Sequence, residues 1–119
     1  MYAVLEYELY WYKGAWFNLT DQIGRHGTGE GAEEFNHAEN TASGNYSHAE
    51  GYGTLASGLA AHVEGHTSHA EGHAAHAEGE LAYALGDSSH AEGMLTRAFG
   101  HRAHAEGLET IATGDEQHV

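Results

Sequence analysis

The sequence predicts an all-β protein that winds into a flattened β-solenoid with fourteen residues per coil, and three periodicities support this fold class. Glycines recur every seven residues, eleven times in succession, from Gly44 to Gly114. An alanine stands two residues before each of these glycines, with Val63 as the one exception. Histidines recur every fourteen residues, from His48 to His118. One coil is therefore expected to contain two short strands, each ending near a glycine.

Composition restricts the kind of protein this can be. The 119 residues include 17 glycines but no proline or cysteine, and so few large apolar residues that a conventional globular core is a poor expectation. The formal net charge of −14 argues against nucleic acid as a partner, because phosphate contacts need clustered cations. Twelve histidines would remove much of this negative charge in mild acid. We find no signal-peptide pattern and no membrane-length apolar run, and expect a soluble chain without membrane insertion.

The first element, residues 1–35, lacks the repeat and is expected to form a separate domain from the solenoid at 36–119. Residues 2–19 predict two strands joined at Lys13-Gly14, as a β-hairpin, and residues 20–36 predict a polar connector. An isolated hairpin is marginally stable in water, so we expect it to pack on the first coil or on its copies in an oligomer. Its aromatic residues would then cap a solenoid end or dock another protein, and a sugar-binding platform is the alternative. These aromatic residues are Tyr10, Trp11, Tyr12, Trp16 and Phe17.

The repeated segment is better explained by strands than by helices. A heptad coiled coil needs large apolar residues at two positions, whereas here the recurring pair is alanine and glycine. Glycine in every second helical turn would cost about 1 kcal/mol each time. We therefore expect short strands separated by turns, with glycine where the backbone needs positive φ or approaches its neighbour closely.

Alternation along each strand assigns its faces. The residue two before each alanine is also small, so this column and the alanines are expected to fill one very narrow interior. The small column comprises Ser47, Thr54, Ala61, Ser68, Ala75, Ala82, Ser89, Thr96, Ala103 and Thr110. Coils stacked about 4.8 Å apart would then place identical positions above one another.

The outward residues differ between the two strands of each coil. On the first strand they are always histidine and glutamate, followed by the glycine. These structural columns are His48, His62, His76, His90 and His104; Glu50, Glu64, Glu78, Glu92 and Glu106; and Gly51, Gly65, Gly79, Gly93 and Gly107. On the second strand the outward pair varies. The pairs are Thr41/Ser43, Leu55/Ser57, His69/Glu71, Tyr83/Leu85, Arg97/Phe99 and Ile111/Thr113.

The pattern HAEG-x-x-T-x-A-x-G-x-x-S resembles the fourteen-residue head repeats of YadA-type trimeric adhesins, in the HAEG variant found in bacteriophage tail and fibre proteins. The resemblance covers about residues 36–119. It implies a left-handed parallel β-roll and association of three chains side by side into a homotrimer. The adhesin heads carry apolar residues, in a pattern like S-V-A-I-G, where this chain has S-H-A-E-G. The same resemblance implies a structural protein of a virion or a bacterial cell surface.

The recurring histidines admit several interpretations. Imidazole and carboxylate are common metal ligands, and three symmetry-related histidines could hold a metal on the trimer axis; beyond that possibility we expect no cofactor. Catalysis needs one distinctive site, whereas the same pair recurs five times, so we expect no enzymatic activity. The favoured interpretation is structural, because a histidine column beside a glutamate column relieves the repulsion between stacked carboxylates. Uniformity along the coils favours the trimer interface over an exposed position for this face.

The variable face is then expected to point outward and to include a possible receptor or trimer contact at Tyr83, Leu85, Arg97, Phe99 and Ile111. We expect a rigid trimeric spacer of a phage tail fibre or bacterial adhesin, in contact with other virion or cell-surface proteins and with a host receptor or glycan. The alternative function is a module that binds metal or anions through the histidine and glutamate columns. His118-Val119 begins a further repeat, which predicts a truncated or processed chain.

Overall fold

The computed structural model describes residues 9–12, 15–18, 25–35 and 39–119, and every regular element in these ranges is a β-strand. A two-stranded antiparallel hairpin comes first, formed by β1 (Leu9–Tyr12) and β2 (Ala15–Asn18). Lys13 and Gly14, where the turn was predicted, lie outside the described residues, as do the aromatic side chains of the hairpin. None of the described residues forms a helix that could span a membrane.

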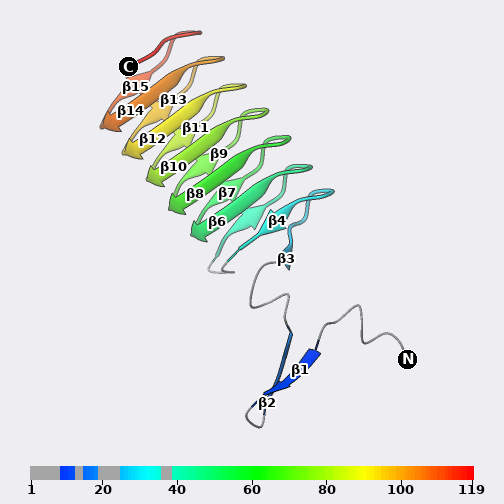
Figure 1. Ribbon diagram of the computed structural model, residues 1–119. Helices are drawn as coiled ribbons and strands as arrows, with labels where there is room; N and C mark the ends of the chain where they lie inside the picture. The colour runs from blue at the N-terminus through cyan, green and yellow to red at the C-terminus, as the bar shows by residue number, and fades with distance from the viewer. Residues whose placement is uncertain (1–8, 13–14, 19–24, 36–38) are drawn as a thin grey trace.

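Two parallel stacks of strands make up the rest of the described chain (Figure 1). The longer strands are β6 (His48–Tyr52), β8 (His62–His66), β10 (His76–Glu80), β12 (His90–Met94) and β14 (His104–Leu108). The two-residue strands that alternate with them are β5 (Thr41–Ala42), β7 (Leu55–Ala56), β9 (His69–Ala70), β11 (Tyr83–Ala84), β13 (Arg97–Ala98) and β15 (Ile111–Ala112). This confirms an all-β parallel solenoid.

The register of both stacks is set by the sequence repeat. His76 is paired with His90 and Glu78 with Glu92, so hydrogen-bonded partners on the long strands are fourteen residues apart. Tyr83 is paired with Arg97 in the same way on the short strands. Each strand therefore lies directly beside its equivalent in the next coil, and identical residues form straight columns.

The long-strand sheet begins before the segment expected to form the solenoid. β3 (Arg25–His26) and β4 (Glu33–Glu34) pair with each other antiparallel, and β4 then pairs with β6 in parallel. Glu33 is opposite His48, so this first pairing spans fifteen residues instead of fourteen. Part of the predicted connector thus belongs to the sheet, while the division into domains at residue 35 stays a prediction.

Small side chains fill the space between the two stacks, as predicted. The alanines of both strand types are fully buried, and Val63 is the largest of the fully buried side chains in the described chain. Ser47, Thr54, Ser68 and Thr96 from the second small column are also buried. Because the interior is this narrow, hydrogen bonds between coils and stacked side chains carry much of the stability.

Glycine is required for close approach of the backbones on the short strands, and for both close approach and positive φ on the long strands. Gly72, on a short-strand turn, has ordinary φ, but a Cβ there would lie 2.0 Å from the carbonyl oxygen of Gly86. Gly79 has φ +117°, and its Cβ would lie 2.0 Å from the oxygen of Gly93. Close approach of successive coils therefore excludes side chains at both positions.

The repeat glycines of the long strands do not lie at the turns between strands. Gly51, Gly65, Gly79, Gly93 and Gly107 lie within strands and continue the pairing for one more residue. The left-handed corner positions are occupied instead by other residues, among them Ala74 (φ 56°), Leu81 (φ 57°) and Ser88 (φ 57°). This conformation costs about 1–2 kcal/mol for a residue with a Cβ, and the sheets on either side hold it in place.

Candidate functional site

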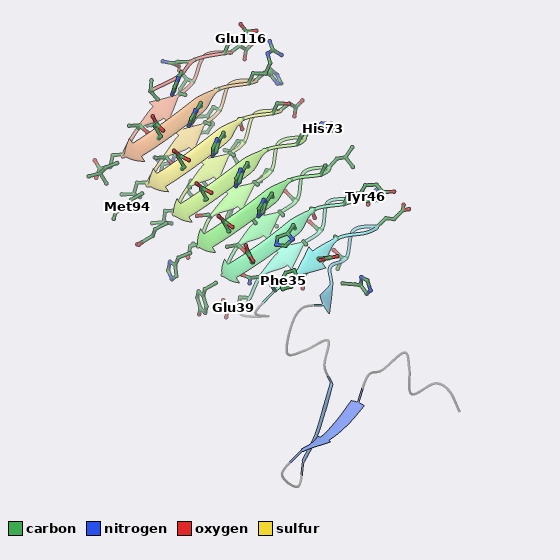
Figure 2. The ribbon with its side chains drawn as sticks, viewed as in Figure 1. Phe35, Glu39, Tyr46, His73, Met94 and Glu116 are labelled. Atoms are coloured by element: carbon green, nitrogen blue, oxygen red, sulfur yellow. The ribbon has the colours of Figure 1, made fainter. Side chains whose placement is uncertain are left out.

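A continuous column of histidine rings runs along the outer face of the long strands (Figure 2). Rings of His62, His76, His90 and His104 lie with centroids 4.7 Å apart and interplanar angles of 2–10°. We call this column, together with His48 and His118, the histidine ladder. Its ring spacing matches the spacing of the strands, so the sheet dictates the stack.

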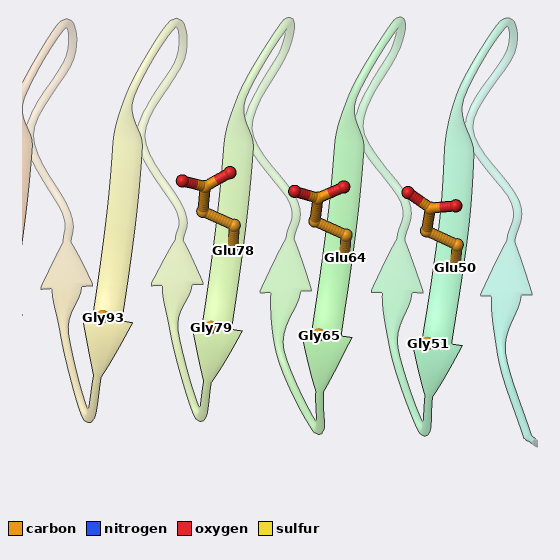
Figure 3. Close-up of a pocket in the computed structure, with 7 residues that line it drawn as sticks. All are labelled: Glu50, Gly51, Glu64, Gly65, Glu78, Gly79 and Gly93. Atoms are coloured by element: carbon orange, nitrogen blue, oxygen red, sulfur yellow. The ribbon is translucent and has the colours of Figure 1, made fainter.

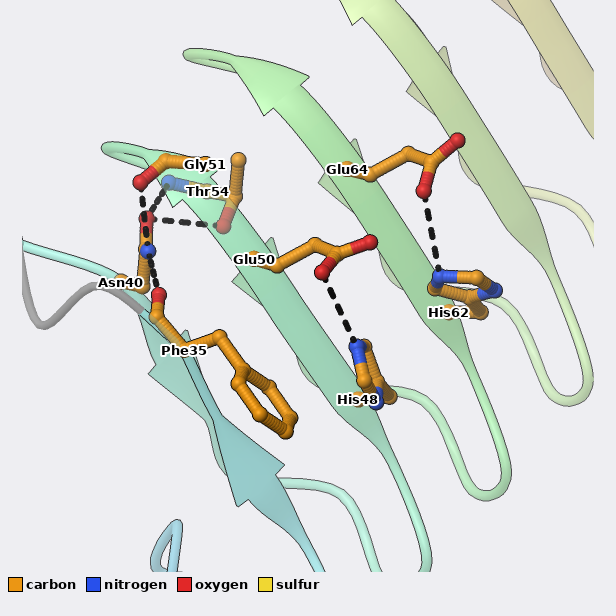
Figure 4. Close-up of polar contacts among 8 residues, drawn as sticks. All are labelled: Phe35, Asn40, His48, Glu50, Gly51, Thr54, His62 and Glu64. Atoms are coloured by element: carbon orange, nitrogen blue, oxygen red, sulfur yellow. Dashed lines mark hydrogen bonds and ion pairs between the residues drawn. The ribbon is translucent and has the colours of Figure 1, made fainter. Parts of the chain in front are cut away.

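A parallel column of carboxylates, the glutamate ladder (Glu50, Glu64, Glu78, Glu92 and Glu106), lies beside the histidines. Each histidine from His48 to His104 faces the glutamate two residues later on its own strand, as Figure 4 shows for the first two. The distance from Nε2 to Oε2 is 3.4 Å for His76 with Glu78 and 3.7 Å for His62 with Glu64. These distances are longer than a normal N–H···O hydrogen bond, and the two groups form an ion pair only when the histidine is protonated.

A shallow groove follows the glutamate ladder on the side away from the histidines. One stretch, of about 520 Å³, is lined by Glu50, Glu64 and Glu78, with the adjoining glycines as its floor (Figure 3). A second stretch, of about 580 Å³, includes Glu92 and Glu106. The groove exists because the glycine column has no side chains, and its wall is uniformly acidic.

The local environment disfavours protonation of the central histidine. Burial lowers the pKa of His76 below its ordinary value of 6.5, and the neighbouring His62 and His90 lower it further. Glu64 and Glu92 oppose this by raising the pKa. The neutral imidazole is therefore the favoured state of His76 near neutral pH.

The carboxylates interact with one another. A hydrogen bond with the side chain of Glu50 lowers the pKa of Glu64 below 4.5, while burial opposes this shift. A further hydrogen bond with Glu78 and the charges of His62 and His76 also lower the pKa.

Several imidazole nitrogens of the ladder have no hydrogen-bond partner within the described chain. The Nε2 atoms of His62, His76, His90 and His104 are shielded from solvent and unpartnered, although their side chains as a whole are about one-third exposed. A polar atom removed from water without a partner costs roughly 1–3 kcal/mol. These nitrogens therefore keep unused hydrogen-bonding capacity, and a ligand or a second chain would reach them only after the side chains turn away from the glutamates of their own strands.

Four sets of side chains along the ladders bring three possible metal ligands together. In each set, one ligand atom per residue lies within 4.8 Å of the others. The sets are His48/Glu50/His62, Glu64/His76/Glu78, His90/Glu92/His104 and His104/Glu106/His118. The last two share His104, so at most three sets can be occupied at once.

The short strands bring together the residues predicted as a receptor or trimer contact. Tyr83, Arg97 and Ile111 lie in register on β11, β13 and β15, and the Arg97 guanidinium lies 5.7 Å from the centre of the Tyr83 ring. Leu85 is half-buried, while Phe99 and Ile111 are 44% and 46% exposed. Tyr83, Arg97 and Ile111 are thus neighbours in one column, and the role of the five residues in binding stays a prediction.

Sequence analysis missed the residues that close the first coil. Asn40, 3% exposed, donates hydrogen bonds from Nδ2 to the carbonyl oxygens of Phe35 and Gly51, and its Oδ1 accepts them from the Thr54 amide and hydroxyl (Figure 4). The Phe35 ring stacks on His48 at 5.0 Å. Asn40 stands fourteen residues before Thr54, in the small column, and this position was a usable signal. Phe35 left no such signal, because the first pairing departs from the fourteen-residue spacing.

One segment of the chain matches a known family model. No curated protein matched the chain. Residues 77–94, which run from β10 to β12, match the family model described as the YadA head domain repeat, in two copies. This segment contains Ala77, Gly79, Ala84 and Gly86, the buried alanines and close-approach glycines of the solenoid. The parallel solenoid therefore contains YadA-type head repeats.

Proposed function

We propose that this chain is a non-enzymatic structural and adhesive segment of a trimeric fibre, on a virion or a bacterial cell surface. The single observation that carries the proposal is the uniform long-strand face, in which histidine and glutamate repeat in register from coil to coil. A catalytic centre would be one distinctive arrangement, whereas a surface that is the same in every coil suits a lengthwise contact with another chain.

The histidine and glutamate ladders are the proposed trimer interface. The shielded Nε2 atoms of His62, His76, His90 and His104 make no hydrogen bond within the described chain, and after a turn of the side chains, carboxylates of a neighbouring chain would satisfy them. A buried charge pair is tolerated only when each member is paired, and a repeated ladder offers this pairing in every coil. Three left-handed rolls side by side, as in YadA-type heads, would bury these faces together.

The proposed assembly is a stiff spacer. Successive histidine rings from His48 to His118 are 4.5–4.9 Å apart, so this part of the shaft extends roughly 24 Å. The patch at Tyr83, Arg97 and Phe99 would then face outward, where aromatic and cationic side chains suit contact with a host receptor or glycan.

A solution mass measurement tests the assembly. We expect light scattering after size exclusion to give three times the chain mass of 12.7 kDa at pH 7.5. The double substitution Glu78→Gln with Glu92→Gln should weaken trimerisation by at least about tenfold, because each removes a charged partner from the interface.

Glu80→Gln is the matched control, since Glu80 is an exposed residue at the end of the same strand as Glu78. It should leave the trimer mass and its concentration dependence unchanged. A monomeric wild-type chain, or a double variant that assembles as the wild type does, would contradict the proposed interface.

A further inference from the structure

We propose that the histidine and glutamate ladders bind divalent transition-metal ions such as Zn²⁺, three per chain, with all protein ligands of each ion supplied by one chain. This goes beyond the spacer function, and a bound ion would compete with the proposed trimer contact for the same side chains. The proposal rests on the four donor sets described above and on the unpartnered Nε2 atoms that belong to them.

The donor chemistry suits ions of the Zn²⁺ type. Two imidazoles and one carboxylate make up the set His90/Glu92/His104, and one imidazole and two carboxylates make up the set Glu64/His76/Glu78. Imidazole nitrogen and carboxylate oxygen are the usual ligands of Zn²⁺ in sites without cysteine, with a water molecule completing the tetrahedron. The formal charge of −14 further favours a cation.

The geometry needs only side-chain adjustment. Ligand atoms of a tetrahedral zinc site lie about 3.4 Å apart. The donor atoms here lie within 4.8 Å of one another, on strands whose backbones are fixed in register. Rotation about the side-chain bonds of half-exposed residues can close this difference, and the backbone needs no movement. The Nε2 atoms lose no existing hydrogen bond when they turn toward a metal.

Overlap between the donor sets determines the stoichiometry. The sets His48/Glu50/His62 and Glu64/His76/Glu78 share no residue with any other set. The remaining two sets both require His104, so only one of them can hold an ion at a time. Three ions per chain is therefore the expected capacity, although the histidine ladder has six members.

This overlap yields a sharp test by calorimetric titration of ZnCl₂ into the full chain, free of any histidine tag and treated with chelator, at pH 7.5. The wild type should bind three ions per chain. His104→Gln should bind two, because both overlapping sets lose a ligand. His90→Gln should still bind three, because His104/Glu106/His118 replaces the lost set. Co²⁺ in place of Zn²⁺ should give visible absorption bands of four-coordinate sites in the same ratios.

His73→Gln is the matched control, because His73 is an exposed turn residue outside all four sets. It should bind three ions, and circular dichroism of each sample checks that the solenoid is retained. One ion per three chains would indicate a site on a trimer axis and overturn the proposal, as would no saturable binding or equal stoichiometry for His90→Gln and His104→Gln. The chain mass, measured on the same samples, distinguishes the metal sites from the trimer interface. A monomer that binds three ions would support the metal sites and contradict the trimer interface.

Discussion

At the scale of single residues, each histidine of the ladder has a role that its own sequence position does not reveal. His76 contacts His62 and His90 above and below, with ring planes within 4° of parallel. Its carboxylate neighbour Glu78 lies 3.4 Å away on the same strand. The stack is compatible with neutral rings, and protonation of successive rings would place like charges less than 5 Å apart.

Acid should destabilise the solenoid. Because burial and neighbouring histidines lower the pKa of His76 in the folded chain, its stabilising contribution is complete above 6.5, the ordinary value, and is lost as pH falls through the lower folded value. The lowered pKa of Glu64 acts in the same direction at pH below 4.5. Thermal melting from pH 8 to pH 5 should therefore show a falling melting temperature below about pH 6.5.

His76→Gln should make this fall shallower, since the variant cannot protonate at the centre of the ladder. His73→Gln, on an exposed turn, should follow the wild-type profile. A melting temperature that stays constant or rises on acidification would contradict the neutral state assigned to His76.

At the scale of elements, the two strands of a coil are held together by a very thin core. Ala91 on β12 is completely buried and is flanked in its column by Ala77 and Ala105. Val63 is the only larger apolar residue that the described alanine columns contain, and it too is fully buried. A column built on methyl groups sets the distance between the two sheets for every coil.

A larger side chain at one position of this alanine column should therefore destabilise the protein. Ala91→Leu should lower the free energy of unfolding by about 1–3 kcal/mol, because the sheets must separate locally to admit the side chain. Glu80→Leu is the control, since Met94 and Leu108 already occupy the exposed column to which residue 80 belongs. It should change stability by less than about 0.5 kcal/mol. Urea unfolding measures both, and equal effects would show that the interior is not the restricted space.

At the scale of the whole molecule, the described solenoid is a one-dimensional array in which each coil contacts mainly its neighbours. Such arrays depend on how their first coil is closed. Here Asn40 is buried in the small column, where later coils carry serine, threonine or alanine, and it bonds four groups of the first coils. Glu34 adds a hydrogen bond accepted by its carboxylate from the amide of Ala42.

Loss of the Asn40 hydrogen bonds should destabilise the first coils and leave the last coils unaffected. Asn40→Ala leaves the oxygens of Phe35 and Gly51 and the amide of Thr54 without their partner, at about 1–3 kcal/mol for each buried group. Hydrogen exchange should therefore accelerate in β4 to β7 and stay unchanged in β12 to β15.

Asn45→Ala is the control, because Asn45 accepts an exposed hydrogen bond from the amide of Glu30 in the same coils. It should alter exchange little. Faster exchange along the whole solenoid in Asn40→Ala would contradict the one-dimensional description.

The sequence by itself determined the solenoid. The seven-residue spacing of Gly72 and Gly79, and the small residues before them, allow only coils that approach each other closely, and the fourteen-residue spacing of His76 and His90 predicted their stacking. These predictions were possible because a repeat makes every coil obey one local rule. The hairpin was also predicted, because it too is a local pairing.

Only the tertiary structure decided where the chain departs from the fourteen-residue repeat. The pairing of Glu33 with His48 across fifteen residues, and the ring of Phe35 on His48, depend on how the chain enters its first coil. Left-handed φ at Leu81 is likewise imposed by the sheets, because no local preference of leucine favours it. The orientation of the histidine rings likewise appears only in the structure, where Nε2 of His62, His76, His90 and His104 makes no hydrogen bond, and this makes the ladder a candidate site.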